Sequence, residues 1–338
     1  MSSDAVTAET PTTMRAVVLD APGPPEALQL RDRPVPVPQP GQVLIKVRAF
    51  GLNQSERHLR RGAATAATFP IVPGIEAVGI VEACPSAVLR VGTKVATMMG
   101  GMGRTFDGGY AEYTCVPETQ VIPFQSDLDW ATVGAVPEML QTAYGSLTVG
   151  LDAQRDQTIL VRGGSSSVGM AIAALSRRMG LTIIATTRTE SKVAAMGAAG
   201  AAHVVLDDGE IFDLVRSIVP AGVHGAVELV GTGTLPDTLR AVRVHGTVCF
   251  TGMLSDQWTV PDFYPIDYLP NGVRLTAYSG EAADLPADVL QTFLDDVAAG
   301  RTSVPVAGTY RFDDIVQAHR DLDAGAHSGK LVVLVGED

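Results

Sequence analysis

A short apolar run that leads directly into a Gly/Ser-rich turn and a small-residue helical pattern is the most constraining feature of this 338-residue chain. It covers residues 159–172, ILVRGGSSSVGMAI. This strand–turn–helix order sets backbone N–H groups and a helix start against a pyrophosphate. Gly164, Ser166 and Gly169 fall on the three glycine positions of the dinucleotide fingerprint, with Ser in the middle. We therefore predict a dinucleotide site made by Gly164, Ser165, Ser166, Ser167, Val168 and Gly169.

The end of the next predicted strand bears on the choice between NAD and NADP. That strand, residues 182–188, begins about 20 residues after the turn, as a βαβ unit requires. It ends in Thr187-Arg188, with Lys192 close behind, where an NAD site usually carries Asp or Glu for the ribose 2′-hydroxyl. A guanidinium and an ammonium suit a 2′-phosphate instead. Solvated charges at a helix start are the alternative, but the position relative to Gly164 favours NADPH.

Composition narrows the class of protein. The formal net charge of −12 argues against a general nucleic-acid surface. No apolar run is long enough for a membrane span. Residues 1–13 lack the basic start and apolar core of a signal peptide, so we interpret them as a loose tail. These features predict a soluble cytoplasmic enzyme without nucleic-acid or membrane partners.

Two parts of the chain differ in the pattern of their predicted strands and helices. Short strand candidates separated by Pro/Gly turns occupy residues 14–129 and predict a small β-barrel. Over residues 130–274, apolar strands alternate with Ala-rich helical patterns, which predicts a doubly wound parallel α/β sheet. A further strand, a helix over about 286–299 and a closing strand over 331–335 follow. We therefore expect an α/β protein with two domains.

Four motifs carry a family resemblance. They are FDGGYAEY at 106–113, LQTAY at 140–144, the Gly/Ser turn, and SGKLVV at 328–333. In this order they resemble the medium-chain dehydrogenase/reductase superfamily, close to its zinc-free quinone oxidoreductase branch. The resemblance implies a GroES-like catalytic domain over 14–129, completed by 275–338. It also implies a Rossmann domain over 130–274, inserted between these parts.

The positions matching the zinc ligands of this superfamily hold Asn53 and Ile75, where zinc members have Cys and His. Neither side chain is a useful zinc ligand. No CxxC pair is present for a structural zinc lobe. Without a Lewis acid, alcohol oxidation loses its main support, whereas reduction of an electrophilic acceptor needs less help. We therefore predict a site without metal that acts on quinones, enones or enoyl thioesters.

Asn53 and Ser55 are the candidate catalytic residues. The Asn53 amide could donate a hydrogen bond to a substrate oxygen or contact the nicotinamide ribose. A structural role in the turn after a strand, where Asn is common, is equally compatible with its position. The Ser55 hydroxyl suits a developing oxyanion, although a helix N-cap is the role we favour. Related enoyl reductases place a Tyr proton donor shortly afterwards, whereas residues 59–68 contain no Tyr. This difference argues against enoyl-thioester reduction by that route.

Further cofactor contacts are expected from the family pattern and from the ends of parallel strands. Thr142 matches a cofactor-contacting position, whereas we interpret Glu138 as a charge at a helix start. Lys330 either reaches the cofactor or is solvated. Backbone groups after two strands are expected to hold the nicotinamide carboxamide, namely those of Val230, Gly231, Gly252 and Met253.

These observations predict an NADPH-dependent, zinc-independent reductase of quinones or α,β-unsaturated carbonyl compounds. The cofactor supplies the hydride, and the protein supplies orientation and oxyanion donors. An enoyl-thioester reductase of lipid or polyketide type is one alternative. A non-catalytic NADPH-binding sensor or interaction protein is the other, because the acid/base set is sparse.

A homodimer is also predicted. Residues 273–278 alternate polar and apolar side chains, and Arg274 is the only charged residue among them. One charge gives an edge strand little protection against pairing with a strand of another chain. The preceding residues 263–270 are unusually aromatic, and aromatic residues favour interface cores. The family resemblance implies a dimer of this type too. Aromatic residues that roof the substrate cleft are the alternative.

Overall fold

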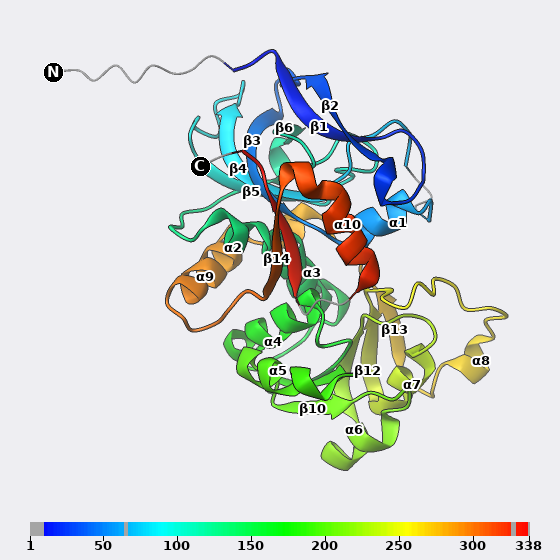
Figure 1. Cartoon of the computed structure of the whole chain (residues 1–338). Coiled ribbons are helices and arrows are strands. Elements are labelled where there is room, and N and C mark those ends of the chain that lie inside the picture. Colours follow the sequence, from blue (N-terminus) through cyan, green and yellow to red (C-terminus); the bar gives the residue numbers. More distant parts are fainter. Residues whose placement is uncertain (1–9, 64–66, 326–328, 337–338) are drawn as a thin grey trace. The chain divides into compact units, whose positions relative to one another are not determined.

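The computed structural model describes residues 10–63, 67–325 and 329–336 (Figure 1). Residues 1–9 of the predicted tail and Ser328 of the last motif lie outside the described residues. The chain divides into two compact units. Unit 1 contains the described residues up to Gln125, Thr309–Gly325, and the described residues from Val332 onwards. Unit 2 contains Ser126–Gly308 and, of the last strand region, residues 329–331.

The secondary structure alternates between strand-rich and mixed segments. The strands are β1 Thr13–Leu19, β2 Leu28–Pro34, β3 Gln42–Gly51, β4 Glu76–Ala83, β5 Lys94–Met98, β6 Tyr113–Pro117, β7 Val121–Pro123, β8 Thr158–Arg162, β9 Thr182–Thr187, β10 His203–Leu206, β11 Val223–Glu228, β12 Val242–Phe250, β13 Arg274–Ala277, β14 Val306–Arg311 and β15 Lys330–Leu334. The α-helices are α1 Gln54–Arg60, α2 Trp130–Gly134, α3 Pro137–Gly145, α4 Ser167–Met179, α5 Val193–Ala199, α6 Phe212–Ile218, α7 Leu235–Ala241, α8 Pro265–Tyr268, α9 Ala287–Ala298 and α10 Ile315–Ala324.

The β-rich unit predicted for the first part of the chain is confirmed. Its seven-stranded sheet has the order β14-β15-β3-β4-β5-β7, and β6 also pairs with β3. The pairings within unit 1 are antiparallel, so tight turns suffice to join neighbouring strands. Val43, Ile45 and Val47 of β3 are buried, and Phe50 stacks on Tyr110 with ring centroids 4.3 Å apart. Alternating apolar residues therefore build the core of this unit.

The doubly wound parallel sheet is confirmed in unit 2. Its strand order is β10-β9-β8-β11-β12-β13, and every neighbouring pair is parallel. This is the 3-2-1-4-5-6 order of dinucleotide-binding sheets, in which the order of the strands reverses between β8 and β11. Leu160, Ile184, Ala226 and Val248 bury their side chains completely in the centre of this sheet. Ligands bind such sheets beyond the carboxyl ends of the strands at the reversal point.

Unit 2 extends further along the chain than the predicted domain over 130–274. Residues 275–308 belong to it, whereas the sequence placed them with the barrel. β13 joins the parallel sheet beside β12. The Tyr278 hydroxyl accepts from Gln141 Nε2 at 2.6 Å and donates to Asp284 Oδ2 at 2.8 Å. These contacts join the segment after β13 to α3, and they depend on residues far apart in sequence.

β13 lies at the edge of its sheet, and all four of its residues are exposed. The segment between β12 and β13 extends away from the sheet of its unit and carries α8 (Figure 1). Five large apolar side chains there are exposed, those of Leu254, Trp258, Phe263, Tyr264 and Ile266. The exposed edge strand and the exposed apolar side chains on which the dimer prediction depends are therefore present. Within the described residues, no helix is both long and apolar enough to cross a membrane.

Candidate functional site

The Gly/Ser turn lies where the fingerprint predicts, between β8 and α4. Gly163 has a φ of +83°, a conformation that glycine adopts most readily. A Cβ on Gly164 would lie 2.7 Å from the Ala185 Cβ, and one on Gly169 would lie 2.6 Å from the Gly164 Cα. The turn, the helix and β9 therefore pack too closely for side chains at these two positions. This explains why glycine stands there.

Ser166 is the N-cap of α4, and its Oγ accepts a hydrogen bond from the Gly169 N–H at 3.1 Å. The hydroxyl hydrogen therefore remains able to donate. The first backbone N–H groups of an α-helix have no partner within the helix and attract anions. α4 is 13 residues long and starts at the carboxyl end of the central strand. The residues present here fit a pyrophosphate.

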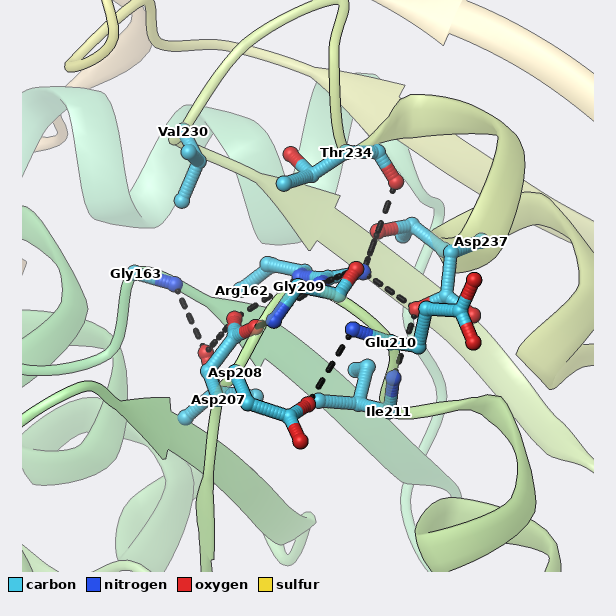
Figure 2. A network of polar contacts seen from close by, with 12 residues as sticks. Arg162, Gly163, Asp207, Asp208, Gly209, Glu210, Ile211, Val230, Thr234 and Asp237 are labelled. Atoms are coloured by element: carbon cyan, nitrogen blue, oxygen red, sulfur yellow. Dashed lines mark hydrogen bonds and ion pairs between the residues drawn. The ribbon is translucent and has the colours of Figure 1, made fainter.

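A buried ionic network that the sequence analysis missed holds the base of this turn (Figure 2). Arg162, the last residue of β8, is fully buried. Its Nε and Nη2 each donate to Asp207 at 2.8 Å, and its Nη1 donates to Asp237 Oδ2 at 2.5 Å. Nη2 also donates to the Gly209 carbonyl at 2.9 Å. One guanidinium therefore joins β8, the end of β10 and α7.

Thr186 connects this ionic network to the Gly/Ser turn. The Gly163 N–H donates to Thr186 Oγ1 at 3.1 Å, and that hydroxyl donates to Asp207 Oδ2 at 3.1 Å. Burial raises the pKa of Asp207, but the hydrogen bonds and charge of Arg162 outweigh it and leave the pKa below its ordinary value. Asp207 is therefore ionised at neutral pH and fixes the start of the turn.

Arg188 and Lys192 lie just beyond β9, on the side where the sequence predicts the 2′-phosphate. Thr187 is buried and accepts a hydrogen bond from the Thr189 N–H at 3.2 Å, whereas Arg188 is exposed. Within the described part of the chain, neither cation forms an ion pair with a carboxylate. Both remain available for an anionic ligand such as a phosphate.

Three N–H groups at the predicted strand ends have partners within the chain, whereas carboxamide contacts through the carbonyl groups there stay a prediction. The N–H groups of Val230 and Gly231 donate to Glu228 Oε1 at 2.7 and 3.1 Å, and the Gly252 N–H donates to the Glu228 carbonyl at 3.0 Å. These three donors are already used within the chain and are not free for a carboxamide. Burial raises the pKa of Glu228, whose Oε2 also accepts from the Thr238 hydroxyl at 2.6 Å. The role of Met253 stays a prediction.

Thr142, Glu138 and Lys330 form one group in unit 2. Pro137 opens α3, so Glu138 lies in its first turn as predicted. Lys330 is 2 % exposed, and its Nζ lies 2.9 Å from Glu138 Oε2. The Thr142 hydroxyl lies 3.2 Å from Glu138 Oε1. Lys330 is therefore not solvated, and Glu138 connects the two predicted cofactor contacts.

Unit 1 brings Asn53 and Ile75 together through one carboxylate. Glu56 accepts from the Asn53 N–H at 2.9 Å and from the Ile75 N–H at 2.8 Å. The Asn53 side chain donates from Nδ2 to Glu76 Oε1 at 2.9 Å. All four residues are buried. The Asn53 amide is thus committed to Glu76, which favours a structural role over contact with a substrate.

The predicted capping role of Ser55 is wrong. The N-cap of α1 is Asn53, and a capping box joins it to Glu56. Ser55 lies in the first turn instead, where Arg104 Nε donates to its Oγ at 3.2 Å and Arg104 Nη2 also contacts it. Arg104 was missed because it stands in a Gly/Met-rich loop. A single arginine among the glycine and methionine residues of this loop was the sequence feature that could have indicated a functional residue.

The other end of α1 is fixed by a buried cluster. Arg60 is 2 % exposed; its Nη2 lies 2.6 Å from Asp323 Oδ2, and its Nη1 donates to the Gly23 carbonyl at 3.0 Å. Burial and the charge of Arg60 lower the pKa of His319 to about 3, so this imidazole is neutral. α1 therefore presents Ser55 from a rigid support.

Within the residues that the structure describes, no group of three His, Cys, Asp or Glu side chains could hold a metal ion. The chemistry of the donors also does not fit zinc. At the matching positions, Asn53 donates its amide to a carboxylate, and Ile75 is apolar. The absence of zinc stays a prediction that metal analysis tests.

Comparison with protein families gives two matches along the chain. Residues 39–126 match the alcohol dehydrogenase GroES-like domain. Residues 199–333 match a family described as zinc-binding dehydrogenase. The first match lies in the β-rich unit, and the second covers much of the parallel-sheet unit.

Curated relatives align along nearly the whole chain. The quinone oxidoreductase of Homo sapiens is 29% identical over 335 residues, covering 95% of this chain and 98% of the relative. That of Lama guanicoe is 28% identical over 337 residues, with the same coverage. An alcohol dehydrogenase of Geobacillus stearothermophilus is 25% identical over 342 residues, covering 93% of this chain and 97% of the relative.

Solved structures share the fold. AibC is 26% identical with a TM-score of 0.85, covering 96% of this chain and 97% of that chain. A mycobacterial protein complexed with NADPH is 27% identical with a TM-score of 0.81, covering 95% of this chain and 99% of that chain. These similarities extend through both units.

Proposed function

Because the chain belongs to the medium-chain dehydrogenase/reductase superfamily, in its quinone oxidoreductase-like branch, we propose that it is an NADPH-dependent, zinc-independent reductase of quinones or α,β-unsaturated carbonyl compounds. Membership makes the chain an oxidoreductase of a family that binds a nicotinamide cofactor. The preference for NADPH and the class of acceptor are the substance of the proposal.

The pair of cations after β9 is the observation that carries the choice of NADPH. Arg188 and Lys192 follow the strand at the place where the ribose of a dinucleotide lies in such sheets. Neither has a carboxylate partner in the described chain, and each suits a phosphate. The mycobacterial structure in complex with NADPH supports the same cofactor.

The chain's own residues have distinct proposed tasks. The start of α4 and Ser166 bind the pyrophosphate, and Arg188 with Lys192 binds the 2′-phosphate. Thr142 and Lys330 contact the nicotinamide half. The bound cofactor supplies a hydride. Ser55 donates to the acceptor oxygen on which charge develops, and Asn53 holds the start of α1 through Glu56 and Glu76.

The proposed oligomeric state is a homodimer, and the proposed location is the cytoplasm. A homodimer through β13 is supported by the exposed edge strand and by the exposed aromatic residues before it. A second copy paired along the same strand would satisfy the free backbone groups. A cytoplasmic location stays a prediction from composition.

Acceptor-dependent oxidation of NADPH tests the proposed function. Purified protein is mixed with NADPH and either 1,4-benzoquinone or 2-cyclohexenone, and the loss of reduced nicotinamide is compared with the product formed. We expect equal amounts of both, and slower turnover with NADH. Arg188→Ala should raise the KM for NADPH, whereas Arg178→Ala, a surface change in the same unit, should not. NADPH binding without turnover of any acceptor would support a sensor instead.

A further inference from the structure

Arg104 occupies a defined place in the loop between β5 and β6. The Met99 N–H donates to the Ile75 carbonyl at 2.7 Å, and the Gly103 N–H donates to the Phe106 carbonyl at 2.9 Å. Gly103 has a φ of +68°, and a Cβ there would lie 2.7 Å from backbone atoms of Gly74. The loop is therefore pressed against the segment that leads to Ile75, and Arg104 starts from a fixed backbone.

The guanidinium of Arg104 has an unusual partner for a cation. Its Nε and Nη2 both contact the neutral Oγ of Ser55. Within the described residues, Arg104 forms no ion pair. Arg57, Arg60 and Arg61 differ, because all three lie against Asp323. The charge of Arg104 is thus uncompensated by a carboxylate, and its side chain is partly exposed.

The contact also sets the direction of the Ser55 hydroxyl. Because Oγ accepts from the guanidinium, its own hydrogen points to another acceptor. An arginine stays charged in proteins, so it strengthens the hydroxyl as a donor without giving up a proton itself. Ser55 O–H and the remaining N–H groups of Arg104 therefore offer an acceptor oxygen two kinds of donor and a fixed positive charge.

We propose that Arg104 is a further catalytic residue, which together with Ser55 holds the oxyanion that forms on the acceptor carbonyl. This inference rests on the proposed function. A bound reduced nicotinamide would supply the hydride and the two electrons that the acceptor gains. Arg104 and Ser55 would hold the negative charge that the addition leaves on the carbonyl oxygen. A proton from water then completes the hydroquinone or the saturated ketone.

The contact with Ser55 uses one edge of the guanidinium. Nε and Nη2 lie against the Ser55 Oγ. Nη1 and the outer N–H of Nη2 form the second edge, which can bind a carbonyl oxygen that gains charge or a carboxylate. Acceptors with and without a carboxylate therefore distinguish the two roles.

The first test compares Arg104→Gln and Arg104→Lys with wild type and with Arg31→Gln, a control on β2 in the same unit. Removal of one oxyanion donor lowers kcat by about 10²–10³-fold. We expect a loss of this size with Arg104→Gln for a neutral enone, with the affinity for NADPH unchanged. Arg104→Lys should recover part of kcat, because it restores the charge. Arg31→Gln should match wild type.

The second test measures the oxyanion site without turnover. With NADP⁺ present, 4-nitrophenol is added slightly below its pKa, and the absorbance of its phenolate is recorded. Wild-type protein should raise the phenolate fraction, and Arg104→Gln should abolish that rise. A misfolded variant would be recognised by its lost affinity for NADPH, and Arg104→Lys then serves in its place.

Three results would overturn the inference. One is an unchanged kcat in both Arg104 variants, and another is no rise in phenolate with wild type. The third is a loss confined to the KM of carboxylate-bearing acceptors, because this would make Arg104 a substrate anchor. If wild type reduces no acceptor at all, the proposed function fails, and that outcome is separate from the other three.

Discussion

Arg162→Met tests the ionic network beneath the cofactor turn. The wild-type guanidinium is fully buried and pairs with Asp207 and Asp237, whose side chains are 8% and 11% exposed. Met fills much of the space but leaves two carboxylates without their cation. Removal of one partner from a buried ion pair costs about 3–5 kcal/mol. Asp237 keeps its bonds from the Ile211 and Phe212 N–H groups, so we expect no more than this range.

Urea unfolding followed by tryptophan fluorescence is the assay. Both tryptophans, Trp130 and Trp258, lie in unit 2, so the signal reports on the unit that contains the network. The matched control is Arg178→Met, which removes an exposed arginine whose Nε lies 2.6 Å from Asp296. Surface ion pairs contribute about 0–1 kcal/mol. The free energy of unfolding should therefore fall much further for Arg162→Met than for the control.

The difference should also depend on pH. The pKa of Asp207 is lowered in the folded protein, so its stabilisation is complete above the unfolded pKa and is lost as the pH falls through the folded value. In Arg162→Met, Asp207 keeps its hydrogen bonds from Thr186 and from the Gly209 N–H but loses the bonds and the charge of Arg162. Its pKa is then higher than in the wild type, so acid relieves the unpaired charge more readily. The gap between variant and wild type should therefore shrink as the pH is lowered from 7 towards about 5.

Two results would refute this reasoning. One is a loss for Arg162→Met no larger than that for Arg178→Met. The other concerns a triple variant with Arg162→Met, Asp207→Asn and Asp237→Asn, which removes the charges together. It should be more stable than Arg162→Met alone, and failure to recover would show that packing, not charge, causes the loss.

Three further experiments test the pyrophosphate site, the dimer and the absence of zinc. Ser166→Val should weaken NADPH binding severely, because a branched side chain fills the space beside the pyrophosphate, and Ser166→Gly only mildly; equal tolerance in a titration would place the pyrophosphate elsewhere. Leu275→Asp should convert a dimer into a monomer in light scattering, and a monomeric wild type would reject the dimer. Purified protein should contain zinc well below one ion per chain and keep its activity in a chelator; stoichiometric zinc would contradict the assignment of Asn53 and Ile75.

Local patterns were enough to predict the parallel sheet, the Gly/Ser turn and the helix that follows it. β9 begins at the predicted residue and β8 one residue before the predicted apolar run, and Gly164 and Gly169 lie in close backbone contact, as the fingerprint requires. These features arise from neighbours in sequence. The roles of Arg188 and Lys192 as phosphate ligands remain predictions.

Long-range contacts account for what the sequence concealed. Arg162 closes an apolar strand, and only the fold reveals that Asp207 and Asp237 meet it. Ser55 resembled an N-cap by type and position, but the capping box of Asn53 with Glu56 takes that role. The N–H groups of Val230 and Gly231 follow a strand end as predicted, yet a buried Glu228 occupies them. Each case depends on a partner that tertiary structure supplies.

The preference for NADPH is measured by the ratio of kcat/KM for NADPH to that for NADH, determined with one quinone acceptor under identical conditions. Each charge-assisted contact to the 2′-phosphate is worth about 1.5–3 kcal/mol, and about 1.4 kcal/mol corresponds to a tenfold change. With Arg188 and Lys192 available to bind that phosphate, we expect a ratio of at least about ten. A ratio of one or below, or no acceptor-dependent oxidation of either cofactor, would contradict this expectation.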